Sequence, residues 1–193
     1  MSNEVEKSIL LDRRSFLSNS GKIALSGTAI ALMSGMSPAK AMSTDSSDSP
    51  EQDTRILNTA ISAEHEAVAA YQLGAESGLL SKGVLNVAVQ FQGHHKEHIE
   101  VLASTVRKLG GEAADAKSSY DFPVHKLKNE KDVLTFAAGL ERGAVSAYAG
   151  AIPLFENSDL AKAAASILAD EAMHWAILRQ ALGLDPVPGA FFS

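Results

Sequence analysis

The stretch that decides the fold reads Asp-Glu-Ala-Met-His-Trp-Ala-Ile-Leu at residues 170–178. Glu171 and His174 are three residues apart, so on an α-helix they point to the same side. Ile167 before them and Leu178 after them fall on that side as well. The pair is therefore set in an apolar stripe, where an unpaired carboxylate is costly to bury. We expect other parts of the chain to supply groups that compensate for it.

The same pattern occurs earlier in the chain at a constant offset. His95 and His98 take the places of the Glu and the His, and Phe91 and Leu102 take the places of the flanking apolar residues. This earlier segment predicts a second helix with a pair of ligand-type side chains on its inward face.

A second repeat links two further segments. Residues 64–71, Glu-His-Glu-Ala-Val-Ala-Ala-Tyr, match residues 141–148, Glu-Arg-Gly-Ala-Val-Ser-Ala-Tyr. In both, the Glu precedes the Tyr by two helical turns, which gives the two residues nearly the same azimuth. The chain thus predicts two related helical hairpins. Each has a Glu on its first helix and a ligand-type pair on its second.

This constellation resembles the ferritin-like superfamily of four-helix bundles. In that superfamily, Glu from two helices and Glu-x-x-His from the other two hold a pair of iron or manganese ions. The resemblance covers residues 54–182 and implies an all-α, ferritin-like four-helix bundle, built from two related hairpins with a long crossover. Carried over position by position, it implies that the metal ligands are Glu64, His95, His98, Glu141, Glu171 and His174.

The chain departs from the family pattern at His95, where the family has a carboxylate that commonly bridges the two metals. Glu97 cannot replace that carboxylate, because it lies about 200° further around the helix. Three outcomes stay open: an altered second metal site, a single ion, or a site that has lost its metal. His95 and His98 could also be a pair of hydrogen-bonded core histidines.

The donor set restricts the metal. Three imidazoles and three carboxylates suit one or two ions of iron or manganese, with zinc as an alternative, better than magnesium or calcium. The resemblance implies chemistry with dioxygen or peroxide, as in an oxidase or peroxidase of oxidative-stress defence. Whether the protein is an enzyme stays open. The alternatives are a metal-free bundle with a structural or stress-related interaction role, and a protein that stores iron in a cage, for which the sequence identifies no cage contacts.

Tyr71 and Tyr148 align in the second repeat. We expect them to pack in the core with hydroxyls satisfied locally, and the alternative is that they donate to ligand carboxylates or are redox-active. His94 is expected to flank the site. Asp170 is expected to face solvent or a neighbouring helix.

Residues 1–41 resemble a twin-arginine export signal. Asp-Arg-Arg-Ser-Phe-Leu at residues 12–17 is similar to the core of those signals, and Ala-Lys-Ala at residues 39–41 offers a cleavage site. The apolar run at residues 23–36 is short for a membrane span. We expect an exported, periplasmic protein that uses the twin-arginine machinery and has no membrane segment in its mature form. An uncleaved anchor is the alternative.

Composition sets further limits. The chain has 193 residues, no cysteine and a formal charge of −6, which suits one domain without disulfides or thiolate metal sites. Without residues 1–41 the chain is more acidic. Its charge therefore does not favour binding to nucleic acid or to an anionic membrane. Metal ions are the expected partners, and a homodimer is left open.

Breaker residues place the element boundaries. Gly78, Gly110 and Gly183 are expected to end helices, and Asn129 is expected to cap one. Residues 42–53 predict a solvated linker, and residues 183–193 an extended tail that covers one end of the bundle or forms a dimer contact. The helices are expected at residues 54–77, 82–109, 131–152 and 159–182, with the crossover at 112–130.

Overall fold

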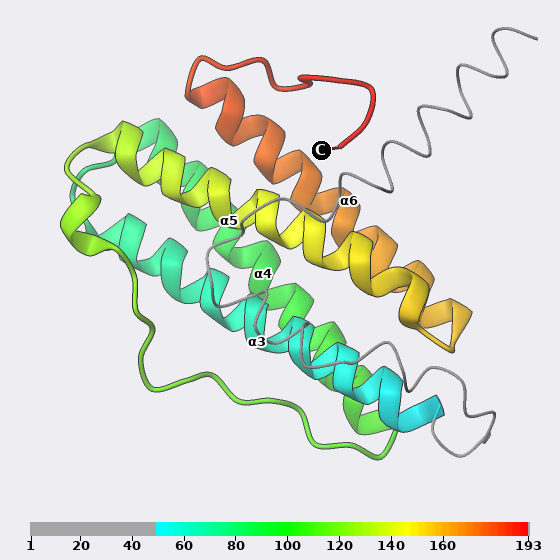
Figure 1. Cartoon of the computed structure of the whole chain (residues 1–193). Helices are drawn as coiled ribbons and strands as arrows, with labels where there is room; N and C mark the ends of the chain where they lie inside the picture. Colours follow the sequence, from blue (N-terminus) through cyan, green and yellow to red (C-terminus); the bar gives the residue numbers. More distant parts are fainter. Residues whose placement is uncertain (1–48, 193) are drawn as a thin grey trace, which may run out of the picture. The chain divides into compact units, whose positions relative to one another are not determined.

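The computed structural model describes residues 49–192, so the expected export signal and most of the expected linker lie outside the described residues. The described chain is all-helical, as predicted (Figure 1). It contains four long helices and two short 3₁₀ helices: α3 (Ser49–Glu76), α4 (Lys82–Lys108), η2 (Val124–Lys126), α5 (Glu130–Ala151), η3 (Ile152–Leu154) and α6 (Ser158–Ala181).

The helix ends follow the local sequence. Gly78, Gly110 and Gly183 have φ angles of 69°, 80° and 72°, in the left-handed region that glycine adopts without a steric penalty. The side chain of Asn129 accepts a hydrogen bond from the backbone N–H of Asp132 and caps α5. These residues confine α3 and α4 to a hairpin with a short turn and fix where α5 begins.

The start of α3 differs from the prediction. Residues 49–53 are helical, so the solvated linker does not extend to residue 53. Asp53 is only 2% exposed, and its carboxylate accepts hydrogen bonds from the backbone N–H groups of Glu156, at 3.0 Å, and Asn157, at 3.2 Å. Because the N–H groups at a helix N-terminus have no partner within their helix, the turn before α6 draws this carboxylate into the bundle.

The crossover connects the two hairpins. It leaves the end of α4, runs along the length of the bundle and enters α5 at the opposite end (Figure 1). Asn58 of α3 holds its first residues: the amide nitrogen donates to the carbonyl of Glu112 at 2.9 Å, and the amide oxygen accepts from the N–H of Ala114 at 2.8 Å. Helices α4 and α5 therefore run parallel, as expected.

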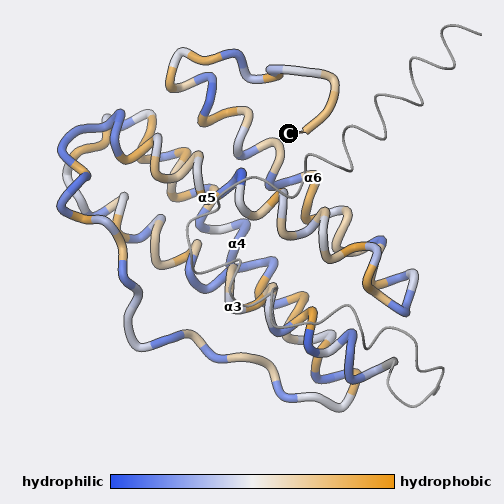
Figure 2. The backbone as a smooth tube through the Cα atoms, viewed as in Figure 1, coloured by the Kyte–Doolittle hydropathy of each residue, from blue (hydrophilic) through white to orange (hydrophobic). Residues whose placement is uncertain are grey.

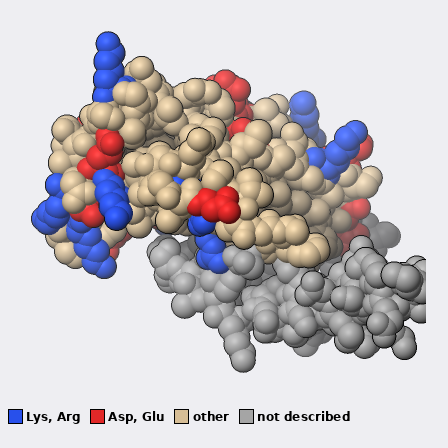
Figure 3. Space-filling model, turned by 90° about the horizontal axis from the view of Figure 1, so that it is seen from above, with Lys and Arg blue, Asp and Glu red and all other residues tan. Residues whose placement is uncertain are grey.

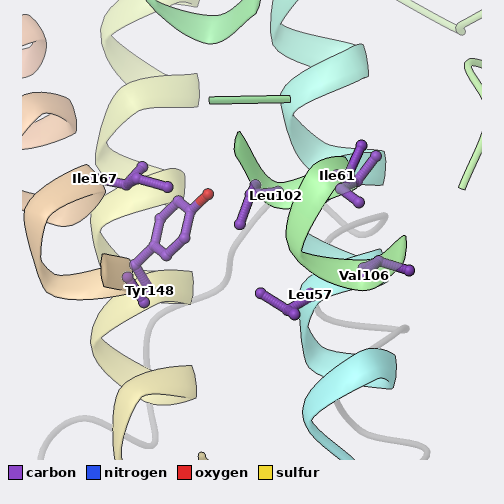
Figure 4. Packing of buried hydrophobic residues seen from close by; sticks show 8 residues of the cluster. Leu57, Ile61, Leu102, Val106, Tyr148 and Ile167 are labelled. Carbon is purple, nitrogen blue, oxygen red and sulfur yellow. The ribbon is translucent and has the colours of Figure 1, made fainter. Parts of the chain in front are cut away.

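The core consists of two apolar clusters. Figure 4 shows one of them, in which Tyr148 of α5 lies between Ile167 of α6 and Leu102 of α4. The other contains Tyr71, Phe91 and Leu178. On each helix, the candidate ligands come between the residues of one cluster and those of the other. The candidate site is therefore in the middle of the bundle, with apolar packing on both sides.

The outer surface is mixed in character. Hydrophobic and hydrophilic residues alternate along each helix (Figure 2), as expected of helices that bury one face. On the face in Figure 3, acidic and basic side chains of the described residues are interspersed. None of the helices between residues 49 and 192 is both long enough and apolar enough to span a membrane.

Candidate metal centre

The four helices bring all six predicted ligands together. Helix α3 supplies Glu64, α4 supplies two histidines, α5 supplies Glu141, and α6 supplies a Glu and a His. Five of the six residues are at most 3% exposed, and the side chain of His98 is 13% exposed. They form two overlapping groups whose ligand atoms lie within 4.8 Å of one another: Glu64, His95, His98 and Glu171, and His95, Glu141, Glu171 and His174.

Glu171 lies between the two groups. Its Oε1 is 3.2 Å from Nδ1 of His98, and its Oε2 is 3.7 Å from Nδ1 of His174. None of these four buried atoms has a hydrogen-bond partner. Buried polar atoms without a partner are rare because they lose hydration without replacing it. Here the four atoms face one another across the site.

His95 lies between two other carboxylates. Its Nδ1 is 2.8 Å from Oε2 of Glu64, and its Nε2 is 3.4 Å from Oε1 of Glu141. Its ring is tilted against that of Tyr71, with the centroids 5.3 Å apart. One ring nitrogen thus faces Glu64 of the first hairpin and the other faces Glu141 of the second. The ring of Tyr71 restricts the orientation of the imidazole.

The two tyrosines donate to the candidate ligands, and each does so across the hairpins. The hydroxyl of Tyr148 on α5 donates to Oε1 of Glu64 on α3 at 2.6 Å, and that of Tyr71 on α3 donates to Oε1 of Glu141 on α5. The expectation that these hydroxyls are satisfied only locally is therefore wrong. The repeat places each Tyr on the same face as its own Glu, and the packing of two hairpins then pairs it with the other Glu.

Asp170 contacts the histidines from the outer side. Its Oδ2 is 3.4 Å from Nε2 of His98, 3.2 Å from Nε2 of His174 and 3.1 Å from Nδ1 of His94. In proteins, carboxylates in this position orient a ligating imidazole and fix its tautomer. Asp170 can do this for two candidate ligands at once. One signal of this role was present in the sequence, since Asp170 is one helical turn before His174.

The cluster shifts the pKa values of its histidines upward. For His95, burial lowers the pKa, but hydrogen bonds to Glu141 and Glu64 outweigh it and raise the pKa to about 10. For His98 and His174, burial has the same opposing effect, and contacts with the Glu carboxylates raise each pKa to about 9. Burial also opposes ionisation of Glu64 and Glu141, yet contacts with the histidines lower the pKa of both.

The residues fit a bound metal. Two Nδ1 atoms and two carboxylate oxygens are buried and unpartnered, and they face one another in two pairs, so a cation in each pair would satisfy all four. Imidazole and carboxylate donors together suit iron, manganese and zinc. The cluster is therefore compatible with metal binding, and Glu171 and His95 belong to both groups of ligands.

An apolar cavity lies next to this cluster. Its volume is about 110 Å³, and residues of all four long helices line it, among them Tyr71, Val84, Leu134 and Leu178. Tyr71 thus has its ring in the cavity wall and its hydroxyl on Glu141. A small apolar molecule in the cavity would be one aromatic ring away from the candidate ligands.

Comparison with known families agrees with the helical fold. Residues 52–184 match the family model of the ferritin-like domain. The chain belongs to the ferritin-like family. Among solved structures, this ferritin-like chain is similar to a conserved hypothetical protein from Mycobacterium tuberculosis, with a TM-score of 0.64 and 21% identity, over 73% of this chain and 97% of that one. At that identity the likeness shows the fold alone. No curated protein sequence matches the chain.

Proposed function

We propose that this protein is an exported ferritin-like protein that binds two iron or manganese ions and reacts with dioxygen or peroxide in defence against oxidative stress. One observation carries the metal-binding part: the buried, unpartnered atoms form two facing pairs, Oε1 of Glu171 with Nδ1 of His98 and Oε2 of Glu171 with Nδ1 of His174. The twin-arginine motif at residues 12–17 supports export.

Each candidate ligand would have a distinct role in binding the two ions. Glu64 and Glu141 would each bind one ion, and Glu171 would bind both, because its two oxygens face different histidines. Iron or manganese at such a site supplies redox chemistry with dioxygen or peroxide. Tyr148 and Tyr71 hold Glu64 and Glu141 in place, and Asp170 orients His98 and His174.

Burial would control what reaches the ions. The ligands between the two apolar clusters are almost fully shielded from bulk water. The apolar cavity beside Tyr71 gives a small apolar substrate, or dioxygen itself, a place near the centre without admitting ions. This feature favours an oxidase that uses dioxygen over a simple store of metal.

The second candidate function is a metal-free bundle with a structural role. The raised pKa values of His95, His98 and His174 support it, because three protonated imidazoles would neutralise three carboxylates without any metal. In that form, however, Oε2 of Glu171 lies 3.7 Å from Nδ1 of His174, which is too far for a hydrogen bond. The metal-bound form explains these atoms, and we therefore prefer it.

Metal content tests the proposal. The protein is purified without chelator, reconstituted anaerobically with Fe(II) or Mn(II), and analysed by inorganic mass spectrometry. We expect about two ions per chain. The Glu171→Gln variant should lose both, and Glu97→Gln, whose side chain is exposed on α4, should keep both. Absence of metal after reconstitution would overturn the proposal and favour the metal-free bundle.

Turnover is measured next on the loaded protein. Oxygen consumption with an electrode and peroxide decay by absorbance distinguish the two oxidants. We expect the loaded protein to consume at least one of the two oxidants faster than free metal does. The Glu97→Gln control should consume it as fast as the unaltered chain. Metal binding without either activity would limit the function to metal storage or transport.

A further inference from the structure

His95 is the place where this chain departs from the ligand pattern of its family, and its surroundings indicate what it does there. Its Nδ1 lies 2.8 Å from Oε2 of Glu64 and 3.6 Å from Oε1 of Glu171. Its Nε2 lies 3.4 Å from Oε1 of Glu141. The two ring nitrogens therefore face different carboxylates, one in each group of candidate ligands.

We propose that His95 bridges the two metal ions as an imidazolate, with Nδ1 bound to the ion on the Glu64 side and Nε2 bound to the ion on the Glu141 side. The inference rests on the proposed binding of two ions and adds how they are connected. A protonated imidazole carries a proton on both ring nitrogens and a neutral one on a single nitrogen, so the bridge requires that the two ions displace every ring N–H proton of His95 and release it to solvent.

The charge balance of the buried site supports the bridge. Two divalent ions bring four positive charges, and the three carboxylates among the candidate ligands, Glu64, Glu141 and Glu171, supply three negative ones. The carboxylate of Asp170 is partly exposed and contacts the outer nitrogens of His98 and His174. The remaining charge would be costly at a place where the ligands are nearly fully buried. An imidazolate at His95 supplies the fourth negative charge, which a carboxylate supplies in the family pattern.

The equivalent positions of His95 and Glu171 in the internal repeat also support the bridge. Glu171 and His95 are equivalent residues in the internal repeat, and they are the two residues shared by both groups. Glu171 has Oε1 near His98 and Oε2 near His174. His95 has Nδ1 and Nε2 distributed in the same way. Each equivalent residue thus offers one donor atom to each ion.

The bridge has a geometric consequence. Metal ions in two-metal sites are commonly about 3.5–4 Å apart. An imidazole ring that binds through both nitrogens keeps the two ions on opposite sides of the ring. The distance between the ions is then longer than with a bridging carboxylate or a single bridging oxygen. Tyr71, whose ring centroid is 5.3 Å from that of His95, restricts rotation of the ring away from this position.

Anomalous diffraction from crystals of the manganese-loaded protein tests the proposal directly. We expect two manganese peaks separated by clearly more than about 4 Å, one at bonding distance from Nδ1 of His95 and one at bonding distance from Nε2. Two ions with His95 bound to only one of them, or to neither, would overturn the inference and leave metal binding intact. Absence of both ions would overturn the proposed function as well.

Two variants provide an independent test in solution by electron paramagnetic resonance of the Mn(II)-loaded protein. His95→Glu restores the family's carboxylate, so we expect the ions to move together, to about 3.5–4 Å, with a changed spectrum of the coupled pair. His65→Gln, next to Glu64 on α3 but outside the cluster, should keep the spectrum of the unaltered protein. An unchanged spectrum in His95→Glu would contradict the bridge.

Discussion

At the scale of single residues, the three buried glutamates are held in different ways. Glu64 and Glu141 each accept a hydrogen bond from a tyrosine of the other hairpin, whereas both oxygens of Glu171 have no hydrogen-bond partner. A carboxylate that accepts such a hydrogen bond has part of its acceptor capacity already used. Glu171 has both oxygens free of hydrogen bonds and facing different histidines, so its position is consistent with a ligand shared by two ions.

The hydroxyl of Tyr148 is expected to stabilise the metal-free fold. Tyr148→Phe removes the donor to Glu64 and leaves a buried ionised acceptor without that partner, which costs about 1.5–3 kcal/mol. Urea unfolding in the presence of chelator should show a decrease of this size in the free energy of unfolding. Tyr120→Phe is the matched control. The hydroxyl of Tyr120 accepts only from a backbone N–H in the exposed crossover, so its loss should change little.

The histidine pKa values predict how the stability of the metal-free protein depends on pH. An unfolded histidine has a pKa of about 6.5, whereas the folded values are about 10 for His95 and about 9 for His98 and His174. The folded state therefore holds protons that the unfolded state releases. The stabilisation is complete below about pH 6.5 and is lost as pH rises through the folded pKa values.

Unfolding by urea between pH 6 and pH 10 in chelator measures this effect, and we expect the free energy of unfolding to fall throughout that range. Metal-loaded protein should show a smaller fall, because its ligand histidines are already deprotonated. A metal-free protein whose stability is constant over this range would contradict the protonated cluster.

At the scale of elements, a contact between the start of α3 and the start of α6 joins the two hairpins. Asp53 accepts two backbone hydrogen bonds from the residues that precede α6. Asn58, one turn further along α3, holds the first residues of the crossover. The first three turns of α3 thus position both connections to the second hairpin.

Asp53→Ala is expected to lower the free energy of unfolding by about 1–3 kcal/mol, because two backbone N–H groups lose their buried partner. Glu51→Ala is the control on the same helix. Its side chain is 75% exposed and pairs only with Arg55 at the surface, so the change should stay within about 0.5 kcal/mol. If Asp53→Ala lowered the free energy of unfolding by no more than Glu51→Ala does, the Asp53 contact would contribute nothing to stability.

At the scale of the whole molecule, the two hairpins complete one another's sites. Each tyrosine donates to the glutamate of the other hairpin, and each group of candidate ligands draws on both hairpins. Neither hairpin alone contains a complete group. Loaded metal should therefore stabilise the association of the hairpins in addition to the fold of each.

The export part of the proposed function belongs to the whole chain. Replacing Arg13 and Arg14 together by Lys should retain the protein in the cytoplasm of a bacterium with twin-arginine export, because the signal depends on the arginine pair. Cell fractionation followed by immunoblotting measures this. Lys7→Gln, outside the motif, should be exported normally. Normal export of the double variant would mean that another route carries the protein.

The sequence by itself determined the helices and the face of each that is buried. A period of 3.6 residues in the apolar pattern, with glycines at the ends, predicted four helices close to those observed. The internal repeat placed Glu64, His95, Glu141 and Glu171 on inward faces, where all four are nearly fully buried. These features are local, since they depend on residues a few positions apart.

Only the tertiary structure decided which side chains meet. The sequence could not reveal that Tyr71 donates to Glu141 and Tyr148 to Glu64, or that Asp53 reaches the turn before α6. Each of these pairs joins residues from different hairpins. Helical periodicity fixes the direction of a side chain around its own axis, but the partner it meets depends on how the helices pack. The packing also gave His95 one carboxylate on each side of its ring.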